Sequence, residues 1–457
     1  MWVGGVVRVS SHHQYGREPE PGTGKGHDTS ILVLRWLFPA VVVDHHGHAA
    51  RAHATSQYVC SPPDVGSAMN TNASSSQSPI VIAAGGTGGH LFPAQALAAE
   101  LQRRGRKLIL ITDNRGDNFA QSFPGADIMH IRAATFAGAG LVGRVKAGLK
   151  IILGIFDAFR ILRRESPKVV IGFGGYPSFP AVYAAQKKNI PTIIHEQNAI
   201  LGKANSYLAP KADRIALSWD SVDSIDESDA VRSVVTGNPV RPDISALYNK
   251  PYPSLEQDGP LKILVLGGSQ GASIFGEVLP EMVAELSTAH KARLDIVQQC
   301  IESDIDRVKQ AYAEVGVKAE LELFFDDVAK RLEECHLVIA RSGAGTVCEV
   351  TTAGRPAIFV PYPYHKDQQQ KRNADAVFDA GGAWVMTQDG FTVDALLARI
   401  ETFLQNPETL FNAAENARSC GKPDAARKLG NLVTALASGW DKNANKALDL
   451  TQGRTHD

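Results

Sequence analysis

Long hydrophobic runs and a strong charge imbalance are both absent from this 457-residue sequence. No uninterrupted apolar stretch approaches the roughly 18 residues that a membrane-spanning helix requires, so we expect no spanning helix. The formal net charge of −1 excludes a global field that would draw the protein to nucleic acid. Any attraction to phosphates or anionic lipid must therefore come from local basic clusters. The composition, 44% hydrophobic and 21% charged, is that of a globular protein large enough for two domains.

Cysteine is scarce, and no two cysteines have the CxxC spacing of a zinc or redox site. The wide separation of the five cysteines favours a reducing cytosol; they are Cys60, Cys300, Cys335, Cys348 and Cys420. A signal peptide is also missing, because no basic segment followed by a long apolar stretch opens the chain and Trp36–Val43 is too short and too late.

Residues 1–78 differ from the rest of the chain. They hold seven of the fourteen histidines among Gly-, Pro- and Ser-rich patches without a sustained period. Scattered histidines favour a solvated segment over a metal site. The GTGKG string at Gly22–Gly26 lacks both a preceding strand and the Ser or Thr of a P-loop. We expect a disordered or mis-assigned extension with Met69 as the true initiator, which an intact-mass measurement would test.

From Pro79 onward, short apolar β-type runs alternate with helical patterns, which predicts βα units and a parallel sheet. A strand that ends in glycines occurs twice, as IVIAAGGTGGH from Ile80 and as ILVLGGSQGA from Ile263, with Gly–Gly pairs at 85 and 267, 182 residues apart. Each repeat opens a domain and offers an anion free N–H groups and a positive helix end. The predicted fold class is therefore α/β, with two Rossmann-like parallel-sheet domains facing a cleft.

The expected segments follow from this repeat. The interdomain connection is placed near GNPVRP at 237–242 and the Pro-rich stretch 251–260. The segments are the extension 1–78, a first domain 79–236, a second domain 237–410, a C-terminal helix 411–438 that packs back toward the first domain, and a polar tail 439–457.

The first glycine-rich turn places His90 at the start of a helix. A dinucleotide site is disfavoured because Leu91 stands where the GxGxxG pattern needs glycine. The positive helix end lowers the pKa of an imidazole and favours a neutral base that could remove a hydroxyl proton. The alternative is a histidine that only hydrogen-bonds the turn.

Polar residues also follow two later strands. GFGGYPS at 172–178 comes after the apolar run Val169–Ile171, and the quartet His195, Glu196, Gln197 and Asn198 ends another strand. Ligands bind at the carboxyl edge of open parallel sheets, so these residues are expected to converge on a site. Ordinary turn chemistry is the competing interpretation.

In the second half, Val338–Glu349 again reads as strand, glycine-rich turn and helix. A carboxylate such as Glu349 near a helix start can accept two hydrogen bonds from the vicinal diol of a ribose, and the neighbouring amides suit a diphosphate. The amide-rich segment His365–Asn373 could read sugar hydroxyls or could simply be solvated. The Asp304-Ile-Asp306 string resembles a metal-binding DxD motif, but it lies in a charged stretch typical of a surface helix, so no metal is predicted.

A basic apolar segment spans Leu141–Arg164. Such a helix can lie in a bilayer interface, but a domain helix must also bury one face on its sheet, so membrane contact and an ordinary core helix are both open. The residues selected as a membrane patch are Lys146, Lys150, Ile152, Ile155, Phe156 and Phe159.

Six motifs in order over 79–438 closely resemble the MurG family, the N-acetylglucosaminyltransferases that convert the first lipid-linked intermediate of peptidoglycan synthesis into the second. The motifs are GGTGGHLFPA (85–94), GFGGYPS (172–178), HEQNAILGKAN (195–205), GNPVRP (237–242), LGGSQGA (266–272) and RSGAGTVCE (341–349). The sequence departs from the family in residues 1–68 and at Cys348, where the family often has Ser.

The resemblance implies a GT-B fold with an N-terminal acceptor domain and a C-terminal UDP-GlcNAc domain. It implies lipid I as acceptor, no essential cofactor or metal, peripheral attachment to the cytoplasmic face of the inner membrane, and other cell-wall synthesis proteins as partners. Its donor contacts fall on Thr87, Gly88, Gly89, Asn198, Arg241, Ser269, Phe325, Ala344, Gly345, Thr346, Glu349, Gln369 and Gln370. Its acceptor side falls on Gly175, Tyr176, Ser178 and His195.

The expected mechanism is direct displacement with inversion, in which His90, or Glu196 as the second candidate, removes the proton of the acceptor 4-hydroxyl. Two rivals stay open: transfer to another membrane lipid, against which HEQN and GGYPS argue, and a non-catalytic nucleotide-sugar-binding subunit. Turnover of donor with acceptor separates the second rival from an enzyme.

Overall fold

The computed structural model describes residues 78–85, 88–113, 123–134, 141–268 and 271–439. These residues belong to one compact unit, Asn70–Asp457. The expectations for residues 1–77 and for the tail from residue 440 lie outside the described ranges.

The first sheet has seven parallel strands in the order β3-β2-β1-β4-β5-β6-β7. Ile80 of the central strand is in register with Leu108 on one side and Val169 on the other. The strand order reverses between β1 and β4, where a parallel sheet of this kind offers a ligand site. The bounds are β1 Ile80–Ala83, β2 Leu108–Thr112, β3 Ala126–His130, β4 Val169–Gly172, β5 Thr192–Glu196, β6 Arg214–Leu217 and β7 Ser233–Val235.

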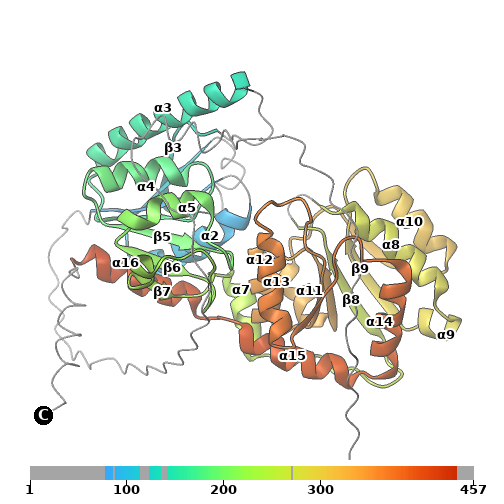
Figure 1. Cartoon of the computed structure of the whole chain (residues 1–457). Coiled ribbons are helices and arrows are strands. Elements are labelled where there is room, and N and C mark those ends of the chain that lie inside the picture. The colour runs from blue at the N-terminus through green and yellow to red at the C-terminus, as the bar shows by residue number, and fades with distance from the viewer. Residues whose placement is uncertain (1–77, 86–87, 114–122, 135–140, 269–270, 440–457) are drawn as a thin grey trace, which may run out of the picture. The chain divides into compact units, whose positions relative to one another are not determined.

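Helices cover both faces of the first sheet (Figure 1). One face buries Ile80 and Ile82 against α2, and the other buries Val81 and Ile109 against α3 and α4. This two-sided burial explains the continuous apolar runs of the strands. The helices are α2 Gly88–Arg103, α3 Leu141–Glu165, α4 Ser178–Lys187, α5 Lys203–Leu208, η2 Ala209–Lys211 and α6 Glu227–Ala230.

The second sheet has six parallel strands in the order β10-β9-β8-β11-β12-β13. Helices α8, α10 and α14 cover one face, and α11, α12 and α13 cover the other (Figure 1). The strands are β8 Leu261–Leu266, β9 Leu294–Gln299, β10 Ala319–Glu322, β11 Leu337–Ala340, β12 Ala357–Phe359 and β13 Ala383–Val385. The helices are α8 Ser273–Glu285, α9 Thr288–Lys291, α10 Ile305–Glu314, α11 Val328–Glu334, α12 Ala344–Thr352, α13 Gln369–Asp379, α14 Val393–Gln405 and α15 Glu408–Cys420.

Two connections join the sheets. The forward connection contains α7 (Pro242–Ser245) and η3 (Ala246–Asn249), and the return leads to α16 (Ala425–Ala437). Leu429 and Val433 of α16 lie in the same apolar cluster as Ile80 and Leu97, so the last described helix completes the core of the first sheet. The predicted α/β class with two parallel sheets is confirmed, and β1 and β8 are the strands of the repeat. Among the described residues no helix is long and apolar enough to cross a bilayer.

Candidate functional site

The predicted site residues of the first sheet gather at its carboxyl edge. Gly85 follows β1 directly, and Gly88 and Gly89 begin α2. Thr87 and Ser269, both expected donor contacts, lie outside the described residues. Gly175 and Tyr176 follow β4, and the quartet from His195 to Asn198 closes β5. The neighbouring order of β1, β4 and β5 brings the three turns together, as the sequence predicts.

His90 lies in the first turn of α2, against the glycine pair that follows β4. Gly174 and Gly175 have positive φ angles of 79° and 73°, which side chains rarely adopt. A Cβ at Gly174 would lie 3.2 Å from His90 Nδ1, and one at Gly175 would lie 2.2 Å from the Gly85 carbonyl oxygen. Only glycine lets the β4 turn approach the β1 turn and the imidazole this closely.

The pKa of His90 is lowered, chiefly by burial of the ring, while the negative charge of Glu196 and hydrogen bonding with Phe173 and Gln197 oppose the shift. The sequence analysis expects the helix dipole to lower the pKa of His90, but burial is the largest cause of the lowered pKa. Among the residues that the structure describes, none forms a hydrogen bond with the buried His90 Nδ1. A neutral imidazole at the carboxyl edge of the sheet can accept a proton near pH 7.

Glu196, the second candidate base, has both carboxylate oxygens occupied. Oε1 accepts hydrogen bonds from the backbone N–H and the side-chain amide of Asn198 at 3.0 and 3.1 Å. Oε2 accepts from the Gly202 N–H at 3.0 Å and from Asn205 Nδ2 at 2.8 Å. A buried carboxylate that accepts four hydrogen bonds holds its loop in place. Because both of its oxygens are occupied, His90 is the better placed base.

His195 is fully buried, and its hydrogen bonds fix its tautomer. Nε2 lies 3.2 Å from the Gly237 carbonyl, which can only accept, so Nε2 carries the proton. Nδ1 then accepts from Gln197 Nε2, which also donates to the Phe173 carbonyl at 2.7 Å. Burial lowers the pKa of His195 to about 4. Ser178 is buried as well, so of the expected acceptor residues only Tyr176, 38% exposed, presents its side chain at the surface.

In the second sheet, α12 begins at Ala344 after β11, with Gly343 as its N-cap and no side-chain cap. A Cβ at Gly343 or Gly345 would meet no atom of the described residues within 4 Å, so these residues leave the space before this helix start open. The first-turn N–H groups, including those of Gly345 and Thr346, have no partner inside the helix and suit an anion. The donor contacts expected at Ala344, Gly345 and Thr346 stay a prediction.

Glu349 pairs with Arg241 across the connection between the sheets. The Arg241 Nε and a Glu349 carboxylate oxygen are 3.2 Å apart, and both side chains are largely buried. Burial raises the pKa of Glu349, while Arg241 opposes the shift. The Arg241 guanidinium also lies 5.5 Å from the ring centroid of Phe92 on α2. Glu349, expected to bind a ribose, and Arg241, another expected donor contact, are therefore each other's partners.

Gln369 and Gln370 open α13, beside an aromatic turn. Gln369 Nε2 lies 3.2 Å from His365 Nδ1, and Gln370 Oε1 accepts from the Tyr362 N–H at 2.9 Å. Gln368 before them has a left-handed φ of 49°. Both amides are held at the carboxyl edge of β12 with part of their hydrogen-bonding capacity in use.

Phe325, an expected donor contact, has its side chain in an apolar cluster of the second sheet. Its side chain is buried beneath the Arg331 guanidinium, 4.2 Å from the ring centroid, whereas Phe324 is 63% exposed. A donor contact through the Phe325 ring would require rearrangement of this packing. Sequence alone offered two adjacent phenylalanines and no period to tell them apart.

The α3 segment has an exposed apolar stripe of Val145, Leu149 and Phe156, which are 64%, 57% and 64% exposed. The four- and seven-residue spacings place them on one helix face. Lys146 and Lys150 are exposed beside them. Of the residues predicted for this patch, Ile155 instead belongs to the core, and Ile152 and Phe159 are half-buried.

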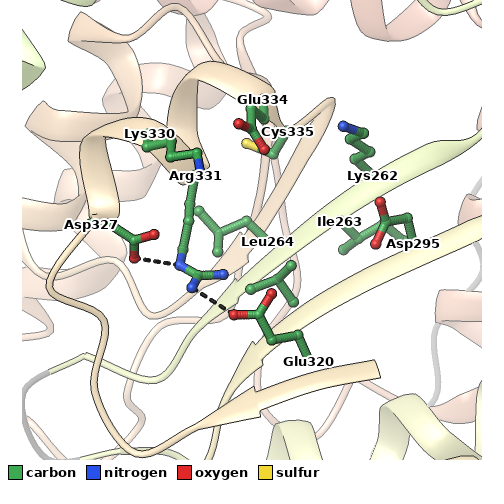
Figure 2. A pocket seen from close by; sticks show the side chains of 11 residues that line it. Lys262, Ile263, Leu264, Asp295, Glu320, Asp327, Lys330, Arg331, Glu334 and Cys335 are labelled. Atoms are coloured by element: carbon green, nitrogen blue, oxygen red, sulfur yellow. Dashed lines mark hydrogen bonds and ion pairs between the residues drawn. The ribbon is translucent and has the colours of Figure 1, made fainter. Parts of the chain in front are cut away.

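A cavity of about 300 Å³ lies away from this edge, between α11 and the strands β8, β9 and β10. Figure 2 shows Arg331 bridging Asp327 and Glu320 at its rim. Lys262 and Asp295, which also line it, lie near the amino ends of their strands. None of the predicted site residues lines this cavity. Within the described residues, no cluster of three His, Cys, Asp or Glu side chains could hold a metal.

Comparison with known proteins gives a consistent result. The glycosyltransferase family 28 N-terminal domain matches residues 80–217, and the C-terminal domain of that family matches residues 262–429. The UDP-N-acetylglucosamine--N-acetylmuramyl-(pentapeptide) pyrophosphoryl-undecaprenol N-acetylglucosamine transferase of Rhodospirillum centenum is 50% identical over 79% of this chain and 95% of its own length. The equivalent protein of Paramagnetospirillum magneticum is 48% identical over 79% and 98%.

A solved structure agrees with these sequence matches. The Acinetobacter baumannii MurG crystal structure is 30% identical to this chain. It superimposes with a TM-score of 0.63 over 78% of this chain and 99% of its own.

Proposed function

We propose, from the premise that this chain belongs to the MurG family within glycosyltransferase family 28, that His90 is the base of its transfer reaction. The chain is a UDP-N-acetylglucosamine glycosyltransferase whose acceptor is the pyrophosphoryl-undecaprenol-linked N-acetylmuramyl-pentapeptide. The observation that carries the proposal is the position of the half-buried His90 imidazole at the start of α2, against the glycine turn after β4.

The proposed step is a single displacement. A ring nitrogen of His90 takes the proton of the acceptor 4-hydroxyl while that oxygen forms a bond to the anomeric carbon of the donor. The bond from the anomeric carbon to the diphosphate oxygen breaks, and UDP leaves with its electron pair. Attack from the opposite face inverts the configuration and gives a β-1,4 linkage.

The leaving group is stabilised by groups of the second sheet in this proposal. The N–H groups at the open start of α12 point toward the position of a diphosphate, and Arg241 supplies a full positive charge nearby. These groups supply the charge that a metal provides in other nucleotide-sugar enzymes. The expected contacts of Thr87 and Ser269 belong to the same proposal.

Glu349 is proposed to bind the donor ribose. In the structure its carboxylate is held by Arg241 at 3.2 Å, so donor binding exchanges one set of partners for another. The ribose hydroxyls donate to Glu349, and the guanidinium turns toward the diphosphate. After the exchange Glu349 still accepts hydrogen bonds and Arg241 is paired with a negative charge, so neither buried charge is left without partners.

The membrane surface is proposed to be the stripe of α3. Burying each exposed apolar side chain contributes roughly 1.5–3 kcal/mol, and each lysine near anionic lipid adds about 1 kcal/mol. Val145, Leu149 and Phe156 with Lys146 and Lys150 are therefore sufficient for reversible attachment. This supports a peripheral protein on the cytoplasmic face of the inner membrane.

The test is UDP release by the full-length protein given UDP-GlcNAc, with and without a short-chain muramyl-pentapeptide lipid, in the presence and absence of EDTA. We expect acceptor-dependent release that persists in EDTA. Release only with a different acceptor lipid would refute the acceptor assignment, and donor binding without any release would indicate a non-catalytic subunit. Loss of release in EDTA would refute the metal-free mechanism.

A further inference from the structure

Asn373 is a fully buried amide on α13 whose three hydrogen bonds reach two other segments of the chain. Its Oδ1 accepts from the Ala199 N–H at 2.9 Å. Its Nδ2 donates to Asn198 Oδ1 at 3.1 Å and to the Ser342 carbonyl at 3.2 Å. One side chain thus joins the loop after β5, the turn before α12 and the helix that carries Gln369 and Gln370.

The orientation of this amide is fixed by its neighbours. Asn198 Nδ2 donates to the Glu196 carboxylate, which can only accept, so Asn198 Oδ1 must face Asn373. Asn373 must then present its NH₂ group to Asn198 and its oxygen to the Ala199 N–H. Turning either amide by half a rotation would place two acceptor oxygens against each other in a buried site. An unmade hydrogen bond is costly there. Glu196, Asn198 and Asn373 therefore form one ordered chain.

We propose that Asn373 is a positioning residue, which holds the donor-sugar residues of the second sheet in register with the acceptor edge of the first. Asn373 lies one helical turn beyond Gln369 and Gln370. Its hydrogen bonds to Asn198 and Ala199, here called the tether, therefore set where the two glutamine amides lie relative to Glu196. Through the β5 turn, the tether also sets their position relative to His90. The inference rests on the proposed transfer reaction, because positioning matters only if reacting groups come from both sheets.

A neighbouring contact provides a matched control. Arg372, the preceding residue of α13, pairs with Asp223 of the first sheet, but both side chains are about half exposed, at 51% and 42%. Exposed ion pairs contribute little to stability, so Arg372→Ala is expected to leave the register intact. Tyr312→Phe removes a buried hydrogen bond to Gln298 inside the second sheet's own core and controls for a general loss of stability.

The kinetic test measures kcat and the dissociation constant of UDP-GlcNAc in the full-length protein. Asn373→Ala is expected to lower kcat about 10- to 100-fold, because misplaced reacting groups lose that much rate. Its UDP-GlcNAc dissociation constant should change less than about threefold, since the proposed donor contacts of α12 and α13 stay within the second sheet and Asn198 keeps its hydrogen bond to Glu196. Arg372→Ala and Tyr312→Phe should retain kcat. An unchanged kcat in Asn373→Ala, or a loss of equal size in Tyr312→Phe, would overturn the proposal.

Asn373→Asp adds a pH-dependent readout. An ionised carboxylate would face two acceptors, Asn198 Oδ1 and the Ser342 carbonyl, whereas a protonated carboxyl can donate to one of them again. The ratio of variant to wild-type kcat should therefore rise as pH falls. A ratio that is flat with pH would contradict a role for the donated hydrogen bond.

Hydrogen exchange of the Ala199 N–H separates this proposal from the proposed function. Asn373→Ala should abolish protection at Ala199 while β5 keeps its own protection, whether or not the protein is active. If the wild-type protein released no UDP, the proposed transfer reaction would be refuted. Hydrogen exchange at Ala199 would still show whether the tether to Asn373 forms. Retained protection at Ala199 would overturn the tether itself.

Discussion

At the scale of single residues, burial decides which polar groups are available for chemistry. His90 follows β1 and its glycine-rich turn, and His195 lies near the end of β5. His195 has both ring nitrogens bonded inside the protein, whereas His90 Nδ1 has no hydrogen-bond partner among the described residues. Glu196 is likewise saturated by four donors. The histidine left with unused capacity is the one at the start of α2.

Replacing His90 by alanine is expected to lower kcat 10²- to 10⁴-fold, the usual worth of a general base. UDP release with acceptor present is the measurement. His130→Ala, which removes an exposed histidine at the end of β3, should retain activity. A loss of much less than tenfold in His90→Ala would show that another group is the base.

The pH dependence of kcat/KM follows from the lowered pKa of His90. The base acts as neutral imidazole, and a lowered pKa keeps it neutral to a lower pH than an ordinary histidine with a pKa of about 6.5. We therefore expect kcat/KM at pH 6.5 to exceed half of its plateau value and to fall only at lower pH. An acid limb centred above pH 6.5 would contradict the assignment.

Glu349→Ala is expected to raise the UDP-GlcNAc KM at least about tenfold and to change kcat less than about threefold, because the ribose does not react. Asp243→Ala is the matched control, since Asp243 is a nearby exposed carboxylate that belongs to α7 and not to the donor contacts. An unchanged donor KM in Glu349→Ala would remove this residue from the site.

Local patterns of strand, glycine-rich turn and helix made His90 and Glu349 candidates, and the family resemblance added Arg241. It could not find the Arg241–Glu349 pair or the role of Asn373, because these contacts join residues 108 and about 175 positions apart. The burial of Phe325 and Ile155 depends equally on tertiary packing. Local pattern thus identified candidate residues, and the fold decided their partners.

At the scale of elements, the glycine turn after β4 is the tightest point of the site. Gly175→Ala would place a Cβ 2.2 Å from the Gly85 carbonyl oxygen, whereas Gly316 has the same φ of 73° with no atom within 4 Å. Both changes carry the left-handed penalty of about 1–2 kcal/mol, and Gly175→Ala adds an overpacking cost of about 1–3 kcal/mol. Chemical denaturation should show this difference, and equal losses in the two variants would contradict the close approach.

The apolar stripe of α3 predicts vesicle binding. Replacing Leu149 and Phe156 by glutamine should reduce binding to anionic vesicles by about tenfold or more, because each loses its apolar contribution. Phe378→Gln and Phe411→Gln remove other phenylalanines of 52% exposure from α13 and α15 and should bind as wild type. Equal losses in both pairs would show that the attachment is not specific to α3. Periodicity predicted this amphipathic helix, but Val145 and Leu149 were missed because only the packed fold shows which face is free.

At the scale of the whole molecule, the two sheets are not independent in sequence. The first sheet is built from residues 80–235, yet part of its core is α16, which follows every element of the second sheet. The connection at 237–249 and the return before α16 lie close together, since Ser245 Oγ donates to the Pro423 carbonyl at 2.7 Å. The sequence predicted the two sheets and a C-terminal helix over 411–438 that packs back toward the first domain, and the structure has two helices there, α15 and α16, of which α16 packs with α2.

The position of α16 has a consequence for synthesis on the ribosome. Every strand of the second sheet is translated before α16 appears, so the second sheet can close its core first. The first sheet, although made earlier, keeps the face that holds Ile80 and Leu97 partly uncovered until residue 437 emerges. At 5–20 residues per second, the 220 residues between Leu217 and Ala437 take roughly 10–45 s. The nascent chain therefore exposes an apolar surface during that interval, which makes it a natural client for chaperones that bind emerging polypeptides.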